Sequence, residues 1–384
     1  MSDKRYKRLG NYIELVQERN KGAHITNLMG VSIAKKFIPS IANIIGTDLS
    51  TYRIVHPGNF AFCPVTSRNG EKITIARYKG NEECIISQAY LPFRVIDENE
   101  LDPDYLMMWV MRSEFDRYAR FHSHGSVREL FSWEEMCNVY LPIPSIEEQR
   151  KIVAEYQAVE QRIENNNRLI KALEDTAQTI YHHTFVENLD PENLPEGWRW
   201  GTLSDLGEII GGATPSTDIS EYWCDNGISW LSPADLSKQG TKFISKGAKD
   251  ITELGYKSCS TKILPKGSVL FSSRAPIGLM AIATQDVCTN QGFKSIVPND
   301  KFGTEYIYYY LTSIKDIIAE ENVGSTFSEV SGQTMKDYKA ILPSKDLIDL
   351  FTRKTKSIFN QQYLVEQENS ILIKTKKLLL SKLS

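Results

Sequence analysis

Two short stretches of this sequence carry residue types that could do catalytic chemistry. Asp102 to Tyr105 reads DPDY, close to the D-P-P-Y stretch of amino-methyltransferases, but the second proline is missing and no glycine-rich cofactor loop precedes it. The start of a helix is the favoured interpretation. Asp337 to Lys339 reads DYK and could end a P-D…D-x-K nuclease pattern, although a surface turn before a helix also explains it. The sequence has no G-x-x-x-x-G-K-[ST] phosphate loop, so we expect no catalysis by this chain alone.

The histidine and cysteine residues are the natural candidates for metal ligands. His122 to His124 reads HSH, but no further Cys/His cluster stands nearby in the sequence. The six cysteines are scattered without a C-x-x-C pair, which favours buried thiols in a reducing cytosol over disulfides or zinc. The sequence therefore predicts no metal site.

Composition describes an ordinary globular protein of more than one domain. The chain has 384 residues with 24% charged and 41% apolar residues, and about 100–200 residues per domain is usual. The first ten residues are charged, and no run of 18 apolar residues occurs, so we expect neither a secretory signal nor a membrane span and predict a cytoplasmic protein. The net charge of −3 does not by itself suggest a nucleic-acid partner.

One segment of the sequence is repeated in the chain. Gly125 to Ser145 and Gly324 to Ser344 lie 199 positions apart and share six identities over 21 positions. Further pairs of similar segments occur in the same order in both halves, which indicates an internal duplication. They are Leu9-Gly10 with Leu206-Gly207, Pro57 to Arg68 with Pro265 to Arg274, Ser87 to Tyr90 with Asn290 to Phe293, and Asp104 to Trp109 with Glu305 to Tyr310.

Each copy of this passage leads into a long helical pattern. Ser145 is a plausible N-cap with Glu148 three residues on, and apolar residues then recur in steps of four and three. Asn166 interrupts this heptad seam with a polar group that needs a partner. The predicted seam residues are Ile152, Val159, Asn166, Leu173 and Ile180 in the first helix and Phe351, Ile358, Val365, Leu372 and Leu379 in the second.

The two helical segments favour each other as partners. Acidic residues outnumber basic ones in 145–197, whereas basic residues outnumber acidic ones in 344–384. This charge difference favours an intramolecular antiparallel pair over homodimerisation, although a long amphipathic helix lying on a globular core would also show such a pattern. Leu364, Ile371 and Leu378 each lie one position before a predicted seam residue, so the second helix could present apolar surface to more than one neighbour.

These features predict an α+β protein with two mixed α/β domains in tandem, separated by two long antiparallel coiled-coil helices. Each helix of ~40 residues would be ~60 Å long. Antiparallel helices would place the two globular units at opposite ends of a pseudo-twofold rod. The predicted parts are residues 1–144, the first domain; 145–190, the first spacer helix and linker; 191–343, the second domain; and 344–384, the second spacer helix.

The sequence resembles the specificity subunits of type I restriction-modification systems. The resemblance covers nearly the whole chain and depends on several motifs in order. It is weaker at Cys63 to Ala76, where the small residues and glycines usual in the family are fewer. The motifs are LGEIIGGATPS (Leu206 to Ser216), WLSPADL (Trp230 to Leu236), LPKGSVLFSSRAPIGLMAIA (Leu264 to Ala283), TNQGFK (Thr289 to Lys294) and LPIPSIEEQRKI (Leu141 to Ile152).

The resemblance implies a DNA-recognition subunit with two target-recognition domains. Each domain would read one half of a bipartite, asymmetric target in double-stranded DNA, and the helices would set the spacing and dock two modification (methyltransferase) subunits. It implies no cofactor on this chain, with S-adenosylmethionine, ATP and Mg²⁺ used by partners that include ATP-dependent restriction subunits. The alternative is a scaffold that binds no DNA and carries two interaction domains on a coiled-coil spacer.

Residue chemistry suggests which side chains would contact DNA. Arg, Lys, Asn and Gln suit base edges, and Ser, Thr and backbone N–H groups suit phosphates. The exposed loops 21–30 and 237–249 differ between the two copies and are further candidates. Gln88 and Gln291 could instead hydrogen-bond inside the fold. The candidate DNA-binding residues are Arg274, Gln291, Lys294, Ser273, Thr214, Arg68, Asn69 and Gln88.

Overall fold

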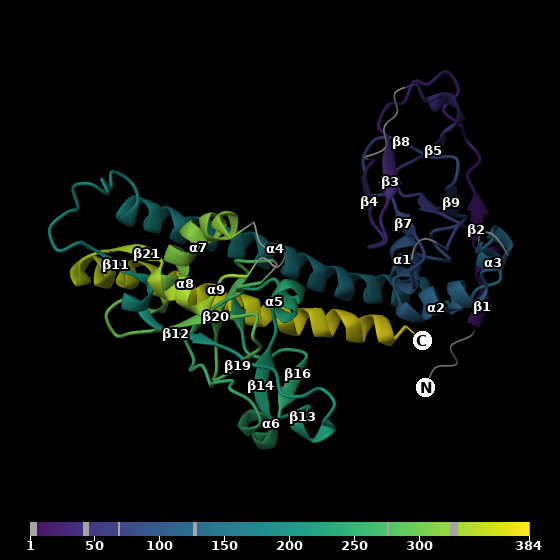
Figure 1. Cartoon of the computed structure of the whole chain (residues 1–384). Helices are drawn as coiled ribbons and strands as arrows, with labels where there is room; N and C mark the ends of the chain where they lie inside the picture. The colour runs from purple at the N-terminus through teal and green to yellow at the C-terminus, as the bar shows by residue number, and fades with distance from the viewer. Residues whose placement is uncertain are drawn as a thin grey trace. The chain divides into compact units, whose positions relative to one another are not determined.

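The chain forms two compact units. The computed structural model describes residues 6–40, 46–67, 70–125, 129–274, 276–322 and 329–383. Unit 1 contains Met1–Ile163 and Ile371–Ser384, and unit 2 contains Glu164–Ser370. Two long helices, α4 (Ile146–Phe185) and α9 (Lys345–Ser381), each contribute one part to unit 1 and the other part to unit 2 (Figure 1).

Unit 1 is built on a four-stranded antiparallel sheet in the order β2-β9-β6-β7, with three two-stranded ribbons, β1-β10, β3-β4 and β5-β8. Phe60 and Phe93 stack in its core with ring centroids 4.9 Å apart. The elements are β1 (Tyr6–Arg8), β2 (Ile13–Leu15), β3 (Met29–Val31), β4 (Phe37–Pro39), β5 (Arg53–Val55), β6 (Phe60–Phe62), β7 (Ile75–Arg77), β8 (Cys84–Ile86), β9 (Leu91–Val95), α1 (Pro103–Val110), α2 (Ser113–Phe121), α3 (Trp133–Cys137) and β10 (Tyr140–Pro142).

Unit 2 contains a five-stranded sheet in the order β12-β20-β17-β18-β15 and a four-stranded sheet in the order β13-β16-β14-β19. The ribbon β11-β21 completes its strands. The elements are β11 (Arg199–Thr202), β12 (Gly207–Gly211), β13 (Trp223–Cys224), β14 (Ile228–Leu231), α5 (Pro233–Gln239), β15 (Phe243–Ile244), β16 (Lys249–Ile251), α6 (Glu253–Lys257), β17 (Val269–Phe271), β18 (Met280–Ala283), β19 (Cys288–Thr289), β20 (Lys294–Pro298), α7 (Gly303–Glu321), α8 (Gly332–Asp337) and β21 (Lys339–Leu342).

The duplication predicted from the sequence is present in the fold. Helices α3 and α8 begin 199 positions apart, as do α4 and α9. The Leu9 N–H donates to the Val139 carbonyl at 2.8 Å, and the Leu203 N–H donates to the Tyr338 carbonyl at 3.0 Å, so both copies close the same ribbon in the same register. This register makes Leu203, and not Leu206, the counterpart of Leu9. The tandem α+β architecture is confirmed.

Helix α4 begins where the sequence predicts. The Ser145 hydroxyl accepts the Glu148 N–H at 3.4 Å, which satisfies one of the unpaired donors of the first turn. Within unit 2, the Phe185 ring lies 5.2 Å from that of Phe351, and Asn166 bonds to Asn369. Residue numbers rise along α4 as they fall along α9, so the helices are antiparallel.

The heptad seam continues through polar residues. All ten residues predicted for the seam are at least partly buried, and so are the polar Thr355, Gln362 and Asn369. Each of these three has a partner: Thr355 donates to the Phe351 carbonyl, Gln362 bonds Glu366, and Asn369 bonds Asn166. Leu364, Ile371 and Leu378 are instead 64%, 64% and 55% exposed. Their apolar stripe is not part of the seam.

Asn166 has the partner that its seam position requires. Its Nδ2 donates to Asn369 Oδ1 and to Glu368 Oε2, each at 3.0 Å, and Asn369 Nδ2 donates to Asn167 Oδ1 at 2.9 Å. Asn166 and Asn369 are 3% and 8% exposed. The amide pair therefore fixes one register of α4 against α9 inside unit 2.

Replacing Asn166 with leucine is expected to lower the free energy of unfolding of unit 2 by about 1–3 kcal/mol, because it leaves the buried Asn369 Oδ1 without its hydrogen-bond donor. The double variant Asn166→Leu/Asn369→Leu is expected to recover most of this loss, since both polar groups are then gone. Urea unfolding of the two variants measures the difference. Equal destabilisation by both would contradict a paired role.

Two general features accompany this fold. Among the described residues, no helix combines the length and apolar character that a membrane crossing would need. All six cysteines are free, and burial raises the pKa of the Cys84 and Cys288 thiols to about 11. Both groups are therefore protonated, unreactive thiols at neutral pH.

Candidate nucleic-acid interface

Five of the predicted DNA-binding residues come together in unit 2. Three backbone segments carry them: the turn after β12, the residues after β17, and the turn that enters β20. We call this group of residues the basic cluster: hydrogen bonds connect Thr214 to Gln291 and Lys294 to Ser273 and Gln291, and Glu329 pairs with both Arg274 and Lys294. It consists of Thr214, Ser273, Arg274, Gln291 and Lys294.

Gly212 brings the first of these segments close enough. A Cβ atom on Gly212 would lie 2.1 Å from the Thr289 carbonyl oxygen and 2.3 Å from that of Asn290, so only glycine fits. The close approach lets the Ala213 N–H donate to the Thr289 carbonyl at 3.0 Å. Thr214 then donates from Oγ1 to Gln291 Oε1 at 2.5 Å.

Gly212→Ala is therefore expected to lower the free energy of unfolding by about 1–3 kcal/mol, the range for atoms forced into a packed site. Gly211→Ala is a matched control one residue away, because its added Cβ would meet no atom nearer than 3.7 Å. Urea unfolding compares the two. A Gly212→Ala protein as stable as Gly211→Ala would show that the β12 turn tolerates a shift.

Backbone pairing holds Arg274 just beyond the end of β17, the central strand of the five-stranded sheet. The Ser273 N–H donates to the Gly292 carbonyl at 2.8 Å, and the Val330 N–H donates to the Ser273 carbonyl at 2.9 Å. Arg274 pairs with Glu329 in an isolated bridge. Its guanidinium Nη2 lies 3.0 Å from Glu329 Oε2, with the arginine side chain 47% exposed. A fixed, half-exposed guanidinium can donate to a base edge or a phosphate.

Lys294 shares the same carboxylate. Its Nζ lies 3.5 Å from Glu329 Oε1 and donates, at 3.4 Å each, to Ser273 Oγ and to the Gln291 carbonyl. Glu329 is thus placed between two cations and neutralises part of their charge. The sequence did not predict Glu329, since the repeat offset aligns it with an apolar residue, Leu130.

Burial separates the roles within the basic cluster. Gln291 is exposed, and Thr214 is half-buried. Ser273 is fully buried, so its hydroxyl supports Lys294 and does not face a ligand. The loop 237–249, also considered for DNA contact, includes Lys242, which is 6% exposed and points into the protein. That lysine is not a surface contact, because aromatic rings and carboxylates enclose it.

Unit 1 has a related but different arrangement. The Phe131 N–H donates to the Pro64 carbonyl at 2.9 Å, as Val330 does to Ser273 in unit 2, which aligns Val65 with Arg274. The predicted pairing of Arg68 with Arg274 is not the one that this ladder gives. Arg68 and Asn69 lie outside the described residues.

Another arginine stands beside the corresponding loop. Arg120, from α2, lies with Nη1 at 2.8 Å from Glu129 Oε2 and donates to the Thr66 carbonyl at 3.2 Å. The register of the sheet aligns Gln88 with Gln291, and Gln88 is exposed in a turn. Sequence reasoning missed Arg120 because it comes from a helix 54 residues after Thr66.

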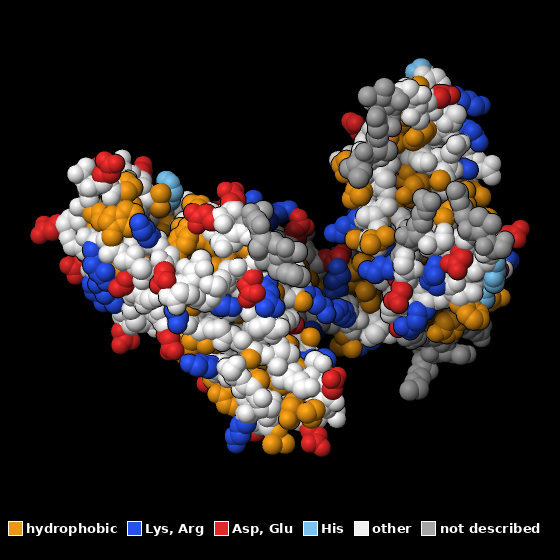
Figure 2. All heavy atoms as spheres, in the orientation of Figure 1, with side chains coloured by type: hydrophobic (Ala, Val, Ile, Leu, Met, Phe, Trp, Pro, Cys, Tyr) orange, Lys and Arg blue, Asp and Glu red, His pale blue; other side chains and the backbone are white. Residues whose placement is uncertain are grey.

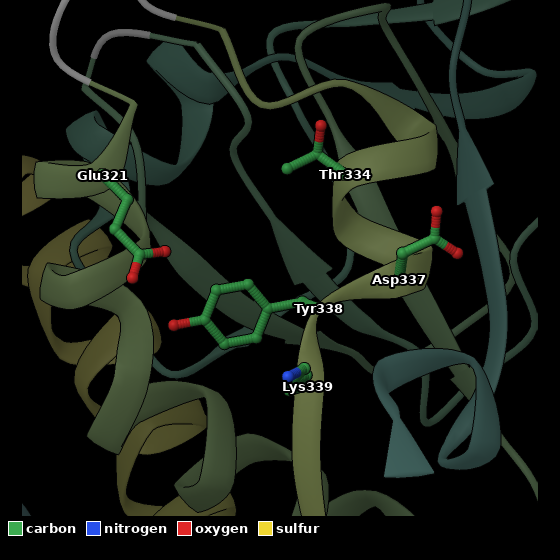
Figure 3. Close-up of a pocket in the computed structure, with 5 residues that line it drawn as sticks. All are labelled: Glu321, Thr334, Asp337, Tyr338 and Lys339. Carbon is green, nitrogen blue, oxygen red and sulfur yellow. The ribbon is translucent and has the colours of Figure 1, made fainter.

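The catalytic-looking motifs have structural roles. Asp102 caps α1 by accepting the Asp104 and Tyr105 N–H groups at 2.8 and 3.0 Å, which confirms the helix start. Asp337 and Lys339 line a hollow of about 430 Å³ with Glu321, but the Asp337 carboxylate points away from Glu321 (Figure 3). Asp337 instead accepts the Gln333 amide at 2.7 Å. These carboxylates do not converge as a nuclease metal site requires.

The wider surface has mixed charge. On the face shown in Figure 2, Lys and Arg side chains are interspersed with Asp and Glu. This mixing agrees with the net charge of −3. Any binding of an anionic ligand by unit 2 would therefore depend on local groups such as the basic cluster.

Comparison with known proteins gives the family. The family model described as "Type I restriction modification DNA specificity domain" matches residues 39–175 and 195–349. The matches cover well over half of the chain, once in each copy of the repeat. The chain belongs to this family.

Relatives of known name are specificity subunits. The chain is 41% identical over 165 residues to the type I restriction enzyme MjaIX specificity subunit of Methanocaldococcus jannaschii, a match that covers 42% of this chain and 38% of that subunit. It is 22% identical over 420 residues to the HindI specificity subunit of Haemophilus influenzae, covering 89% of each. The solved S subunit of the type I system from M. genitalium has the same fold, with a TM-score of 0.63 at 14% identity, covering 100% of this chain and 97% of that one.

Proposed function

We propose that this chain is the DNA-recognition subunit of a type I restriction-modification complex. Each recognition domain, 1–144 and 191–343, reads one half of a bipartite target in double-stranded DNA. The observation that carries this proposal is the duplicated fold with different cationic side chains in its two copies: Arg274 and Lys294 in one and Arg120 in the other, beside the equivalent Gln291 and Gln88. Two copies of one fold that carry different base-contacting side chains are expected to recognise different half-sites, and the target is then asymmetric.

The long helices set the spacing of the two half-sites and dock the partner subunits. A helix of ~40 residues is ~60 Å long and exceeds one turn of DNA, ~34 Å, so a gapped target is expected. The exposed stripe of Leu364, Ile371 and Leu378 supports docking, since apolar side chains repeated every seven residues suit another helix. We assign two modification subunits to this complex.

Chemistry belongs to the partners in this proposal. The modification subunits methylate adenine with S-adenosylmethionine, and restriction subunits use ATP and Mg²⁺ when they join. This chain contributes selection of the target and no catalytic group. The complex acts on DNA in the cytoplasm.

Mapping methylated adenines in host DNA tests the proposal. Deleting the gene is expected to remove methylation at one gapped, asymmetric motif. Replacing residues 1–144 with the recognition domain of another specificity subunit is expected to change one half of that motif. Survival of every methylated motif after deletion, or change of both halves after the replacement, would contradict it.

Affinity purification separates this function from a scaffold that binds no DNA. Co-purification with a methyltransferase subunit supports recognition, whereas recovery of unrelated partners alone supports the scaffold. Because the surface charge is mixed, the isolated chain is expected to bind DNA weakly, with an affinity that falls steeply with salt concentration. Tight binding by the isolated chain at about 200 mM salt would show that partners are not needed to neutralise phosphates.

A further inference from the structure

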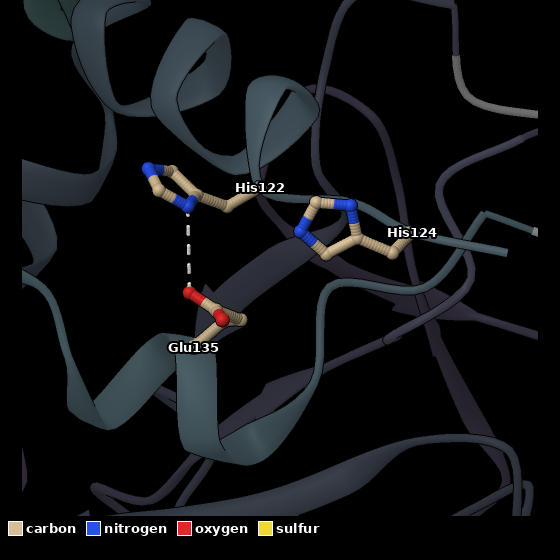
Figure 4. A group of neighbouring side chains, drawn as sticks. All are labelled: His122, His124 and Glu135. Carbon is tan, nitrogen blue, oxygen red and sulfur yellow. Dashed lines mark ion pairs between the residues drawn. The ribbon is translucent and has the colours of Figure 1, made fainter.

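Three side chains with metal-binding atoms meet in unit 1, and none of them belongs to the basic cluster of unit 2. They are His122 and His124, which follow α2, and Glu135 of α3. One nitrogen of each histidine and one carboxylate oxygen of Glu135 all lie within 4.8 Å of one another (Figure 4). The sequence predicted no metal site here, because the third ligand is a carboxylate that α3 brings back.

The distances suit a small divalent ion. His122 Nδ1 lies 3.5 Å from Glu135 Oε2. Ligands bound to zinc at about 2.0–2.1 Å in a tetrahedron are separated by about 3.3 Å, so this pair already stands near a binding geometry. One nitrogen of His124 lies within 4.8 Å of both other ligand atoms and would move closer to them when the ion binds.

The backbone of each ligand is held by its own hydrogen bonds. His122 ends α2, with its N–H donating to the Tyr118 carbonyl at 3.0 Å. His124 exchanges two backbone hydrogen bonds with Leu130, at 2.9 and 3.1 Å. The Glu135 N–H donates to the N-cap hydroxyl of Ser132 at 3.1 Å. Ligands on backbone that is already fixed lose little freedom when an ion binds.

Exposure and ligand type point to the kind of ion. The side chains of His122 and Glu135 are 33% and 29% exposed, and His124 is exposed, so an ion can enter from solvent. Two imidazoles and one carboxylate match the ligand set of Zn²⁺ and differ from the all-oxygen set that Mg²⁺ prefers. Three protein ligands leave one position for water.

We propose that His122, His124 and Glu135 bind one Zn²⁺ ion, which joins the end of α2 to α3 in the first recognition domain. The ion replaces the direct contact between His122 and Glu135 with bonds to both. It also holds the His124–Leu130 pairing, and Leu130 pairs in turn with Val65 before the loop considered for DNA contact. This inference does not depend on the proposed DNA-recognition function.

Calorimetric titration of the chelator-treated, full-length protein with Zn²⁺ tests this site. Saturable binding of one ion per chain is expected, together with a higher unfolding temperature when Zn²⁺ is present. His124→Ala and Glu135→Gln are each expected to weaken binding by at least about tenfold and to abolish the thermal shift. Mg²⁺ in place of Zn²⁺ is expected to give neither response.

His182→Ala is the matched control, because it removes an exposed histidine from α4, outside the three ligands. It is expected to bind Zn²⁺ as the wild-type protein does. Absence of saturable Zn²⁺ binding would overturn the proposal, as would binding that His124→Ala leaves unchanged or that His182→Ala weakens equally. His124 is exposed, so its alanine variant is expected to fold, which circular dichroism without metal verifies.

Discussion

Lys242→Met is expected to lower the free energy of unfolding of unit 2 by about 3–5 kcal/mol, the cost of breaking a buried ion pair from one side. The Lys242 side chain is 3% exposed, and its Nζ lies 2.9 Å from Glu174 Oε2. It also donates to the Tyr309 hydroxyl at 2.7 Å and to Gln362 Oε1 at 3.3 Å. Methionine keeps the volume but leaves these three oxygen atoms without the cation.

Aromatic rings around Lys242 add to the effect. Its Nζ lies 3.9 to 4.5 Å from the ring centroids of Phe359, Tyr309 and Tyr308, distances at which the faces of the rings attract a cation. Burial lowers the pKa of Lys242, and the neighbouring charge of Glu174 opposes this shift. The lysine is therefore tolerated in the interior because its surroundings supply both charge and hydrogen-bond acceptors.

The second carboxylate near Lys242, that of Glu366, accepts hydrogen bonds from the backbone. Glu366 of α9 accepts the Phe243 N–H at 3.1 Å and the Lys242 N–H at 3.4 Å, and burial raises the pKa of this carboxyl group. These N–H groups belong to the start of β15, an edge strand of the five-stranded sheet. Glu174 and Glu366 thus tie this sheet to both helices within unit 2 and cover an otherwise open edge.

Urea unfolding and amide hydrogen exchange measure the Lys242 effect. Exchange in β15 should rise in Lys242→Met, while exchange in β9 of unit 1 should stay unchanged. Lys262→Met is the control, since Lys262 is 63% exposed and lies 3.8 Å from Glu208; it should change stability by less than about 0.5 kcal/mol. Adding Glu174→Gln to Lys242→Met should recover part of the loss, because the carboxylate that lost its direct ion pair with Lys242 is then gone. A Lys242→Met protein as stable as Lys262→Met would refute the role of the network.

Elements with strong local signals were predictable. The two long helices were predicted from a 3.5-residue apolar repeat and a serine N-cap. The tandem fold was predicted from similar segments that occur in the same order in both halves. These features depend on residues close together in the sequence.

Features that depend on distant partners were not predictable. Lys242 looks like a surface lysine until Glu174 and Glu366 are placed, 68 and more than 120 residues away. Similarly, Gln362 and Asn369 look like breaks in the seam, yet they are buried, with Lys242 donating to Gln362 Oε1 and Asn166 donating to Asn369 Oδ1. A polar side chain can be buried only where a hydrogen-bond partner lies beside it. The sequence alone does not show which distant residues come together in the fold.

The candidate interface was half predictable for the same reason. Residue chemistry selected Arg274, Lys294, Gln291 and Thr214, and the fold brings all four together. Nothing in the sequence indicated that Glu329 lies between the two cations. A single carboxylate changes what the site can do, since it competes with any anionic ligand for both basic groups.

Glu329→Gln and Arg274→Ala are expected to change DNA binding in opposite directions, a prediction that rests on the proposed function. Arg274→Ala should weaken binding of the assembled complex to its target by about 1–3 kcal/mol, the usual cost of losing one arginine contact to a base. Glu329→Gln should strengthen binding to target and unrelated DNA alike, by up to about tenfold. One unit charge a few ångströms away is worth about 1 kcal/mol in water and more near a protein surface.

The physical reason is that Glu329 holds Arg274 and Lys294 in place while it offsets their charge. Glutamine keeps the shape and one acceptor oxygen but removes the negative charge that a phosphate would meet. The ratio of target to unrelated DNA affinity should therefore fall in Glu329→Gln, because the cations become freer to bind any phosphate. Fluorescence anisotropy with both DNAs at one fixed salt concentration measures this ratio.

Controls from the Lys262–Glu208 pair decide whether these effects are local. Both side chains are more than 60% exposed, so Glu208→Gln and Lys262→Ala alter the net charge of unit 2 by the same amounts as Glu329→Gln and Arg274→Ala. If the control variants changed DNA affinity as much as the cluster variants, overall charge and not the Arg274–Glu329–Lys294 geometry would govern binding. A local role requires the opposite result, because screening at physiological salt limits an exposed charge to about 8 Å.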